Sequence, residues 1–404
     1  MKRLRHMVLL LMLATVSCGG DSGDDLTRPA DTDDTTGSGV ELLSLEDDVS
    51  RRTDQPGQHE WWNFLAEDIS SGLAISTIFV NGNLFDINYR IALEQYRDDP
   101  KSQPAPRPGD YVLLQLNVIK DGRKVFSSVK LPPDTTANFE RERPYGYIGN
   151  SWFEGVEENG EHVWRVHIDS PDMFNWLRLE ADLEYRDASQ GCTVAGGGFF
   201  APVPGGLGSG IHFPIAKPVT TGHVRITNRL GKVTLDEDLA GGGHFDHIFG
   251  KFYSDLTHSY YFGRLDLEAD GDVLYFYHYP RDPEVPPHGW LLRFLTNGRT
   301  PVTYKVETLN ESQPETGAMG LGYSSVIEMT LAGGGAARTY MERTAASEDW
   351  PFQVTGIGHF NIQIPGDIDV TDVIGIAEYG YFDGLDDPLF RFLYSLLDSF
   401  PWIP

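Results

Sequence analysis

One short stretch of this chain concentrates the side chains that could transfer a proton. Residues 241–250 read Gly-Gly-Gly-His-Phe-Asp-His-Ile-Phe-Gly, which places Asp246 between His244 and His247. On a β-strand, His244 and Asp246 would point to one side and His247 to the other, because successive side chains alternate. A carboxyl group enclosed by aromatic rings could act as a general acid if burial raises its pKa. These residue types predict acid–base chemistry, with Asp246, His247 and His244 as the catalytic candidates.

Aromatic residues supply the second requirement of such a site. A Glu-Trp-Trp run begins at residue 60, and the tyrosine-rich runs 260–262 and 275–279 follow the histidine stretch. Aromatic faces stabilise positive charge without acting as nucleophiles, so a proton donor beside them could protonate an alkene and guide the carbocation. We predict that a ligand site is lined by Glu60, Trp61, Trp62, Phe249, Tyr261, Tyr275 and Tyr277.

The same residues allow two other interpretations. A buried network of His and Asp side chains could fix the junction of two sheets and perform no chemistry. His244, Asp246 and a distant histidine could also hold a metal, although a His-x-Asp pair alone is a weak signal. We predict neither a metal nor any other cofactor. The chain contains no Gly-x-Ser-x-Gly and no His-Glu-x-x-His, so serine hydrolase and zinc protease functions have no local support.

The elements that must position these side chains are strands. Residues 176–185 alternate between apolar and polar side chains, which is typical of a strand with one buried face. Segments 73–80, 111–118, 163–168, 273–279, 302–306, 326–331 and 374–382 are similar, and turn signals such as Asp121-Gly122 and Asn159-Gly160 separate such runs. Short strands joined by tight turns predict an all-β fold of antiparallel sandwiches or barrels. One amphipathic helix is expected over 384–404, with Asp387 as its cap.

The N-terminus predicts export. Residues 1–17 combine a basic start with a short apolar core and small residues before Cys18, as in a signal peptide. Cys18 resembles the lipidated cysteine of a bacterial lipobox, and several acyl chains give stable anchoring. Residues 18–50 are predicted to be a disordered acidic tether. We therefore expect a cell-membrane lipoprotein, in the outer membrane and facing the periplasm or the cell surface. Cys192 is then left with no intramolecular disulfide partner.

The formal net charge of −27 argues against nucleic acid as a partner and against charge-driven docking on anionic lipid. About 350 residues follow the tether, which is long enough for two domains.

Two motifs resemble a known family. Residues 60–62 and 243–250 are similar to the Glu-Trp-Trp-Tyr and Gly-Tyr-His-Asp-His-Asn-Trp-Gly motifs of the carotenoid 1,2-hydratase (hydroxyneurosporene synthase) and AttH-like proteins. The resemblance implies two tandem lipocalin-like antiparallel β-barrels, which we assign to residues 51–232 and 233–383. It also implies hydration of terminal isoprenoid double bonds, or cyclisation of apolar substrates, with His247 as the second histidine of the motif.

The chain departs from that pattern at several positions. Asn63 replaces a Tyr, Ile248 replaces an Asn, and Phe249 replaces the Trp next to the active-site histidine. The downstream strand, residues 275–279, lacks the Asp that the family is thought to use as proton donor.

Three functions remain open from the sequence. The first is a lipid-anchored protein that binds an apolar small molecule such as an isoprenoid, a lipid or a polyketide. The second is an acid-catalysed hydratase or cyclase acting on an isoprenoid-like substrate, with Asp246 as donor. The third is a surface interaction scaffold whose barrels are filled and hold no ligand.

Overall fold

The structure is a computed structural model of the whole chain. It describes residues 40–381 except for 52–53, 85, 132–135, 173–175, 188–190, 195–208, 216, 252–256, 268–270, 282, 296–300, 318–319, 343–347 and 350–352. The predicted signal peptide, Cys18 and the helix expected over 384–404 lie outside the described residues. Among the residues described, no helix has both the length and the apolar character needed to cross a membrane.

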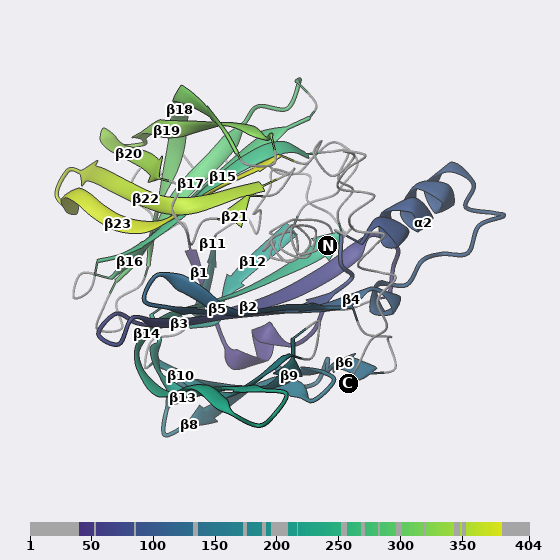
Figure 1. Ribbon diagram of the computed structural model, residues 1–404. Helices are drawn as coiled ribbons and strands as arrows, with labels where there is room; N and C mark the ends of the chain where they lie inside the picture. The colour runs from purple at the N-terminus through teal and green to yellow at the C-terminus, as the bar shows by residue number, and fades with distance from the viewer. Residues whose placement is uncertain are drawn as a thin grey trace.

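The described chain is built from two antiparallel sheets that lie one above the other (Figure 1). The first is a curled open sheet. Its strands, in spatial order, are β5 (Arg123–Lys130), β4 (Val112–Lys120), β3 (Leu73–Asn81), β2 (Gln58–Asp68), β14 (Val233–Lys251), β13 (Val219–Asn228), β10 (Leu177–Asp187), β9 (Glu161–Pro171), β8 (Ser151–Glu158), β7 (Tyr145–Ile148) and β6 (Ala137–Phe139). Three short strands attach beside β14, namely β12 (Ser209–Phe213), β11 (Gly191–Val194) and β1 (Val40–Leu43).

The second sheet closes into a barrel. Its order is β20 (Gly335–Glu342), β19 (Gly322–Leu331), β18 (Val302–Thr316), β17 (His288–Phe294), β16 (Asp272–Pro280), β15 (Thr257–Asp266), β23 (Ile368–Tyr381) and β22 (Gln353–Ile364), and β22 pairs back with β20. The two-residue β21 (Glu348–Asp349) adds to β22.

The all-β prediction is confirmed, but the expectation of two closed barrels is wrong for the first sheet. Its end strands, β5 and β6, do not pair with each other in the described part of the chain. The alternation read along residues 176–185 appears as β10, in which Leu179, Leu183 and Tyr185 are buried. Both residues of the Asp121-Gly122 turn have positive φ, as a tight hairpin requires.

Three apolar cores hold the fold together. The first lies in the curl of the first sheet and contains Trp62, Phe64 and Phe245, and the second fills the closed barrel. The third lies between the two sheets, where Trp61 and Ile248 from the first sheet join Phe276 and its neighbours from the second. A guanidinium group also spans this layer, because Arg264 on β15 donates to the carbonyl oxygen of Gly243 on β14 at 3.0 Å.

Three details differ from the sequence-based expectation. The strand β14 begins at residue 233, where the second domain was expected to start, yet it pairs with β13 and β2 of the first sheet. Residues 40–48, placed in the disordered tether, form β1 and the 3₁₀ helix η1 (Leu45–Asp48). The helix α2 (Ile87–Asp98) was not predicted, although Asp86 caps it by accepting from the N–H groups of Asn88 and Tyr89.

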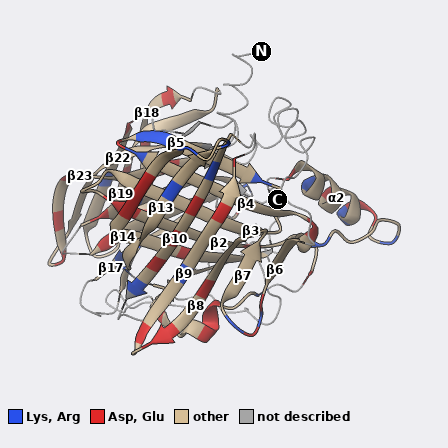
Figure 2. Ribbon diagram, turned by 60° about the horizontal axis from the view of Figure 1, so that its bottom comes forward, with Lys and Arg blue, Asp and Glu red and all other residues tan. Residues whose placement is uncertain are grey.

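Acidic and basic residues are interspersed along neighbouring strands of the first sheet, among them β9 and β10 (Figure 2). Arg165 on β9 pairs with Glu184 on β10 at 3.3 Å, and Arg178 pairs with Asp169 at 2.6 Å. In both of these cross-strand pairs an acidic partner offsets the basic group.

Candidate functional site

The two motifs of the sequence meet because β2 and β14 are neighbouring strands. Asp246 lies opposite Asn63, and Phe245 lies opposite Phe64. Alternation along each strand then divides the motif residues between two faces of the sheet. We call the face that carries Trp62 and Phe64 the inner face, and the face that turns toward the barrel, with Trp61 and Ile248, the interlayer face.

Asp246 and His244 lie on the interlayer face. The Oδ2 atom of Asp246 accepts a hydrogen bond from Asn63 Nδ2 at 3.2 Å and lies 3.0 Å from His244 Nε2. Its Oδ1 atom is buried and has no hydrogen-bond partner. Because only one carboxylate oxygen is held by protein groups, the other could interact with a molecule bound in this layer.

Aromatic rings extend from His244, the partner of this carboxyl group, toward the barrel. The ring of His244 lies 5.9 Å from that of Phe213 on β12, and Phe213 contacts Phe294 on β17 at 5.2 Å. The layer therefore combines an acid with an apolar aromatic wall, as the chemistry of alkene protonation requires.

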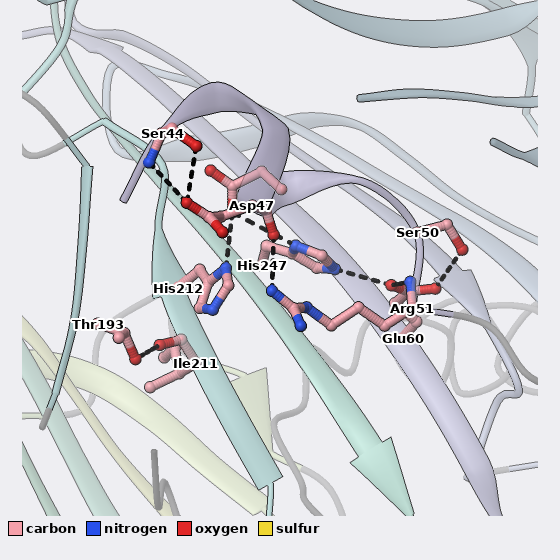
Figure 3. A network of polar contacts seen from close by, with 10 residues as sticks. Ser44, Asp47, Ser50, Arg51, Glu60, Thr193, Ile211, His212 and His247 are labelled. Carbon is pink, nitrogen blue, oxygen red and sulfur yellow. Dashed lines mark hydrogen bonds and ion pairs between the residues drawn. The ribbon is translucent and has the colours of Figure 1, made fainter. Parts of the chain in front are cut away.

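His247 points to the opposite side and belongs to a different group. We call Asp48, Glu60, His212 and His247 the inner cluster. Nε2 of His247 lies 3.0 Å from Glu60 Oε1, and Nδ1 of His212 lies 2.8 Å from Asp48 Oδ1. Nδ1 of His247 lies 3.7 Å from the same oxygen of Asp48. Figure 3 shows the imidazole of His247 directed at Glu60, with His212 beside it.

The inner cluster is fully enclosed. Its four side chains are 7% exposed or less. Ser50 Oγ donates to Glu60 Oε2 at 2.7 Å, and the Arg51 N–H donates to Oε1 at 2.5 Å. The ring of Trp62 stacks on that of His247 with centroids 4.6 Å apart. Trp62 is thus a core aromatic of the first sheet.

Burial and neighbouring charges shift the pKa values of three residues in the inner cluster. Burial opposes protonation of His247, but the carboxylates of Asp48 and Glu60 outweigh it and raise the pKa of His247. Burial would raise the pKa of Asp48, yet the two imidazoles beside it hold that pKa below its usual value. Burial lowers the pKa of His212, because Asp48 compensates only in part.

The outer edge of the cluster is formed by Phe249 and Arg51. The ring of Phe249 lies 5.1 Å from that of His247 and 4.8 Å from that of His212. The guanidinium carbon of Arg51 lies over this ring, 4.6 Å from its centroid. This cation–π contact separates the cluster from solvent.

The predicted tyrosines lie elsewhere. Tyr261, Tyr275 and Tyr277 belong to the core of the closed barrel, and the hydroxyl of Tyr261 donates to Glu311 at 2.7 Å. The structure therefore brings Glu60, Trp62, Phe249 and His247 together on one face and separates them from the tyrosines and from Asp246.

Sequence reasoning missed Asp48 and His212. These two residues are separated by 164 positions, and no local motif marks either of them. Asp48 also falls in the segment that composition assigned to the tether. The pairing of β12 with β14 sets His212 opposite His247, and the packing of η1 against these strands adds Asp48.

Comparisons with known proteins support the motif-based resemblance. No protein-family model matches the chain. A hydroxyneurosporene dehydrogenase from Chlorobaculum tepidum is 33% identical over 79 residues, and the match spans only 20% of each chain. An AttH protein from Nitrosomonas europaea shares the fold with a TM-score of 0.56 and 13% identity, over 84% of this chain and 97% of that one. Kievitone hydratase from Nectria haematococca gives a TM-score of 0.54 and 11% identity, over 85% and 94%. The resemblance indicated by the two motifs is thereby confirmed.

Proposed function

We propose that this chain, a relative of the AttH-like and carotenoid 1,2-hydratase-like proteins, is a hydratase-type enzyme that acts on an apolar small molecule. The observation that carries the proposal is Asp246, whose Oδ1 is buried and unpartnered in an aromatic layer. The fold shared with kievitone hydratase supports the same reaction class. The named activities of the related proteins belong to those proteins, and here they inform the class only.

The proposed reaction has two steps. The carboxylic acid form of Asp246 transfers its proton from Oδ1 to one carbon of an alkene, and the other carbon becomes a cation. The oxygen of a water molecule then bonds to the cation and returns one proton to the carboxylate. Hydrogen bonds from Asn63 and His244 hold Oδ2, so Oδ1 keeps a fixed orientation toward the substrate.

Apolar surroundings serve this chemistry in two ways. The aromatic rings of Phe213 and Phe294 exclude bulk water and stabilise the positive charge of the intermediate. Trp61, which lies on the same interlayer face as Asp246, adds a further apolar surface for the substrate.

The proposal retains the predicted location. A signal peptide over residues 1–17 and lipidation at Cys18 would tether the enzyme to a membrane outside the cytoplasm. Palmitate labelling of wild type and Cys18→Ser in a bacterial host tests this part, since only the wild type should carry the label.

The test of function is hydration of an acyclic isoprenoid alcohol in water enriched in heavy oxygen, followed by mass spectrometry. We expect a product that has gained one labelled water, and Asp246→Asn should lower its rate about a hundredfold or more. Asp238→Asn is the matched control, because Asp238 lies on the same strand with a side chain that is 91% exposed.

Two results would count against the proposal. If Asp246→Asn converts the alcohol as fast as Asp238→Asn does, Asp246 is not the donor. If the wild type binds the alcohol but leaves it unchanged, the chain is a carrier for apolar molecules and not a hydratase.

A further inference from the structure

The inner cluster gathers three potential metal ligands that the reaction proposed above does not use. Asp48, His212 and His247 each offer one ligand atom, and these atoms lie within 4.8 Å of one another. All three residues are buried. They come from η1, β12 and β14, so the group exists only in the folded chain.

We propose that Asp48, His212 and His247 form a binding site for a divalent transition cation of the zinc class. A tetrahedral zinc ion with bonds of about 2.0–2.2 Å places its ligand atoms about 3.3 Å apart. The Asp48 oxygen lies 2.8 Å from one imidazole nitrogen and 3.7 Å from the other. Both separations lie within about 0.5 Å of the required value, and all three ligand atoms lie within 4.8 Å of one another.

An unsatisfied nitrogen points independently to a ligand. His247 is 0% exposed, and its Nδ1 has no hydrogen-bond partner. The distance of 3.7 Å to Asp48 is too long for a hydrogen bond. A buried polar atom without a partner is costly, and a cation between Nδ1 and the Asp48 oxygen would satisfy it.

The second nitrogen of the same ring has the arrangement typical of metal-binding histidines. Nε2 of His247 faces Glu60 at 3.0 Å, and Glu60 is itself held by Ser50 and by the N–H of Arg51. A carboxylate that accepts the Nε2 proton directs the lone pair of Nδ1 toward the site and makes it a stronger ligand. Figure 3 shows this chain from Ser50 through Glu60 to His247.

The donor set selects the kind of ion. Two imidazoles and one carboxylate suit zinc, cobalt, nickel or copper, whereas magnesium and calcium prefer oxygen ligands alone. Three protein ligands leave a fourth position for water, as in zinc sites that are not purely structural. The ring of Trp62 covers one face of His247 and limits the room around the ion.

The site lies apart from Asp246. His247 and Asp246 are adjacent on β14 and therefore point to opposite faces of the sheet. The metal proposal does not rest on the hydratase proposal, and either one can fail alone.

The test uses the full chain purified without added metal and stripped with a chelator. Titration with zinc, followed by calorimetry, should show one site per chain. Cobalt should give the intense visible absorption of a tetrahedral complex. His212→Gln should weaken zinc affinity at least a hundredfold, and Glu60→Gln should weaken it about 10–100-fold, because Glu60 only orients His247.

The motif supplies the matched control. His244→Gln changes a histidine of the same strand that faces the interlayer side, and it should leave zinc affinity unchanged. Should His212→Gln fail to fold, the comparison of Glu60→Gln with His244→Gln still decides the matter. The proposal is overturned if the wild type binds zinc no tighter than about 1 mM, or if Glu60→Gln and His244→Gln bind it equally. The hydration activity of the wild-type sample tests the separate proposal for Asp246.

Discussion

Replacing Arg264 with methionine should destabilise the contact between the two sheets. Arg264 is buried on β15 and donates to Asp272 Oδ2 at 3.0 Å and to the carbonyl oxygen of Gly243 at 3.0 Å. Its Nη2 also lies 3.3 Å from Glu67 on β2. One guanidinium group thus connects the closed barrel to both motif strands of the first sheet. Methionine keeps much of the apolar stem but removes the charge and all of these donors.

The expected loss of unfolding free energy depends on the buried Asp272 carboxylate, which loses a partner. Asp272, with a side chain that is 1% exposed, loses one of its two cationic partners and keeps Lys217 at 3.2 Å. Removing one partner of a buried ion pair costs about 3–5 kcal/mol. Because Lys217 remains, we expect the lower end, about 3 kcal/mol, which is a large fraction of a typical total stability of roughly 5–15 kcal/mol.

The assay is urea unfolding followed by tryptophan fluorescence, with the free energy of unfolding taken from the linear dependence on urea. Arg338→Met is the matched control, since Arg338 pairs with Glu328 on the surface and should cost no more than about 1 kcal/mol. In an Asp272→Asn background, the cost of Arg264→Met should fall by at least about 1 kcal/mol, because the unpaired charge is gone. A loss for Arg264→Met equal to that of Arg338→Met would refute the reasoning.

Two further predictions concern buried titratable groups. Burial lowers the pKa of His59 to about 3. Between about pH 3 and 6.5 the unfolded chain therefore binds more protons than the folded chain does. The contribution of His59 should make the free energy of unfolding fall as the pH drops below about 6.5. Urea unfolding at several pH values checks this, and a weaker acid dependence is expected for His59→Phe; an identical dependence in the two proteins would contradict it. Burial raises the pKa of the Cys192 thiol to about 12, so an aromatic disulfide reagent at pH 8 should modify it only after denaturation. Rapid modification of the native chain would contradict the buried placement on β11.

Local patterns were enough to predict strands and turns. The alternation in residues 176–185 and the Asp121-Gly122 turn reappear as β10 and as a tight hairpin between β4 and β5. The helix α2 escaped prediction because its polar composition carries a weak apolar pattern, and its capping residue Asp86 was the one clear signal. Closure of the second sheet was not predictable either, because it also requires β15 to pair with β23, and the paired residues, such as Leu265 and Gly375, are 110 or more positions apart.

The candidate site was predictable in its residue types and not in its partners. The sequence singled out Glu60, His247 and Asp246, and alternation along a strand already separated the last two. It could not show that His247 meets Asp48 and His212, since these residues precede it in the chain by 199 and 35 positions. The tyrosines of the closed barrel were grouped with the site because of their chemistry, although the topology places them in another core.

The sequence by itself determined the period of the strands, the positions of tight turns, the acidic surface and the pair of motifs that carry the resemblance. Each of these depends on interactions between neighbours in the chain, such as side-chain alternation and the backbone angles that glycine and asparagine allow. Tertiary structure alone decided which residues share a face across strands, that the first sheet stays open while the second closes, and that a carboxylate from the N-terminal segment faces two histidines. Those outcomes depend on strand pairing between distant segments, which local residue patterns do not specify.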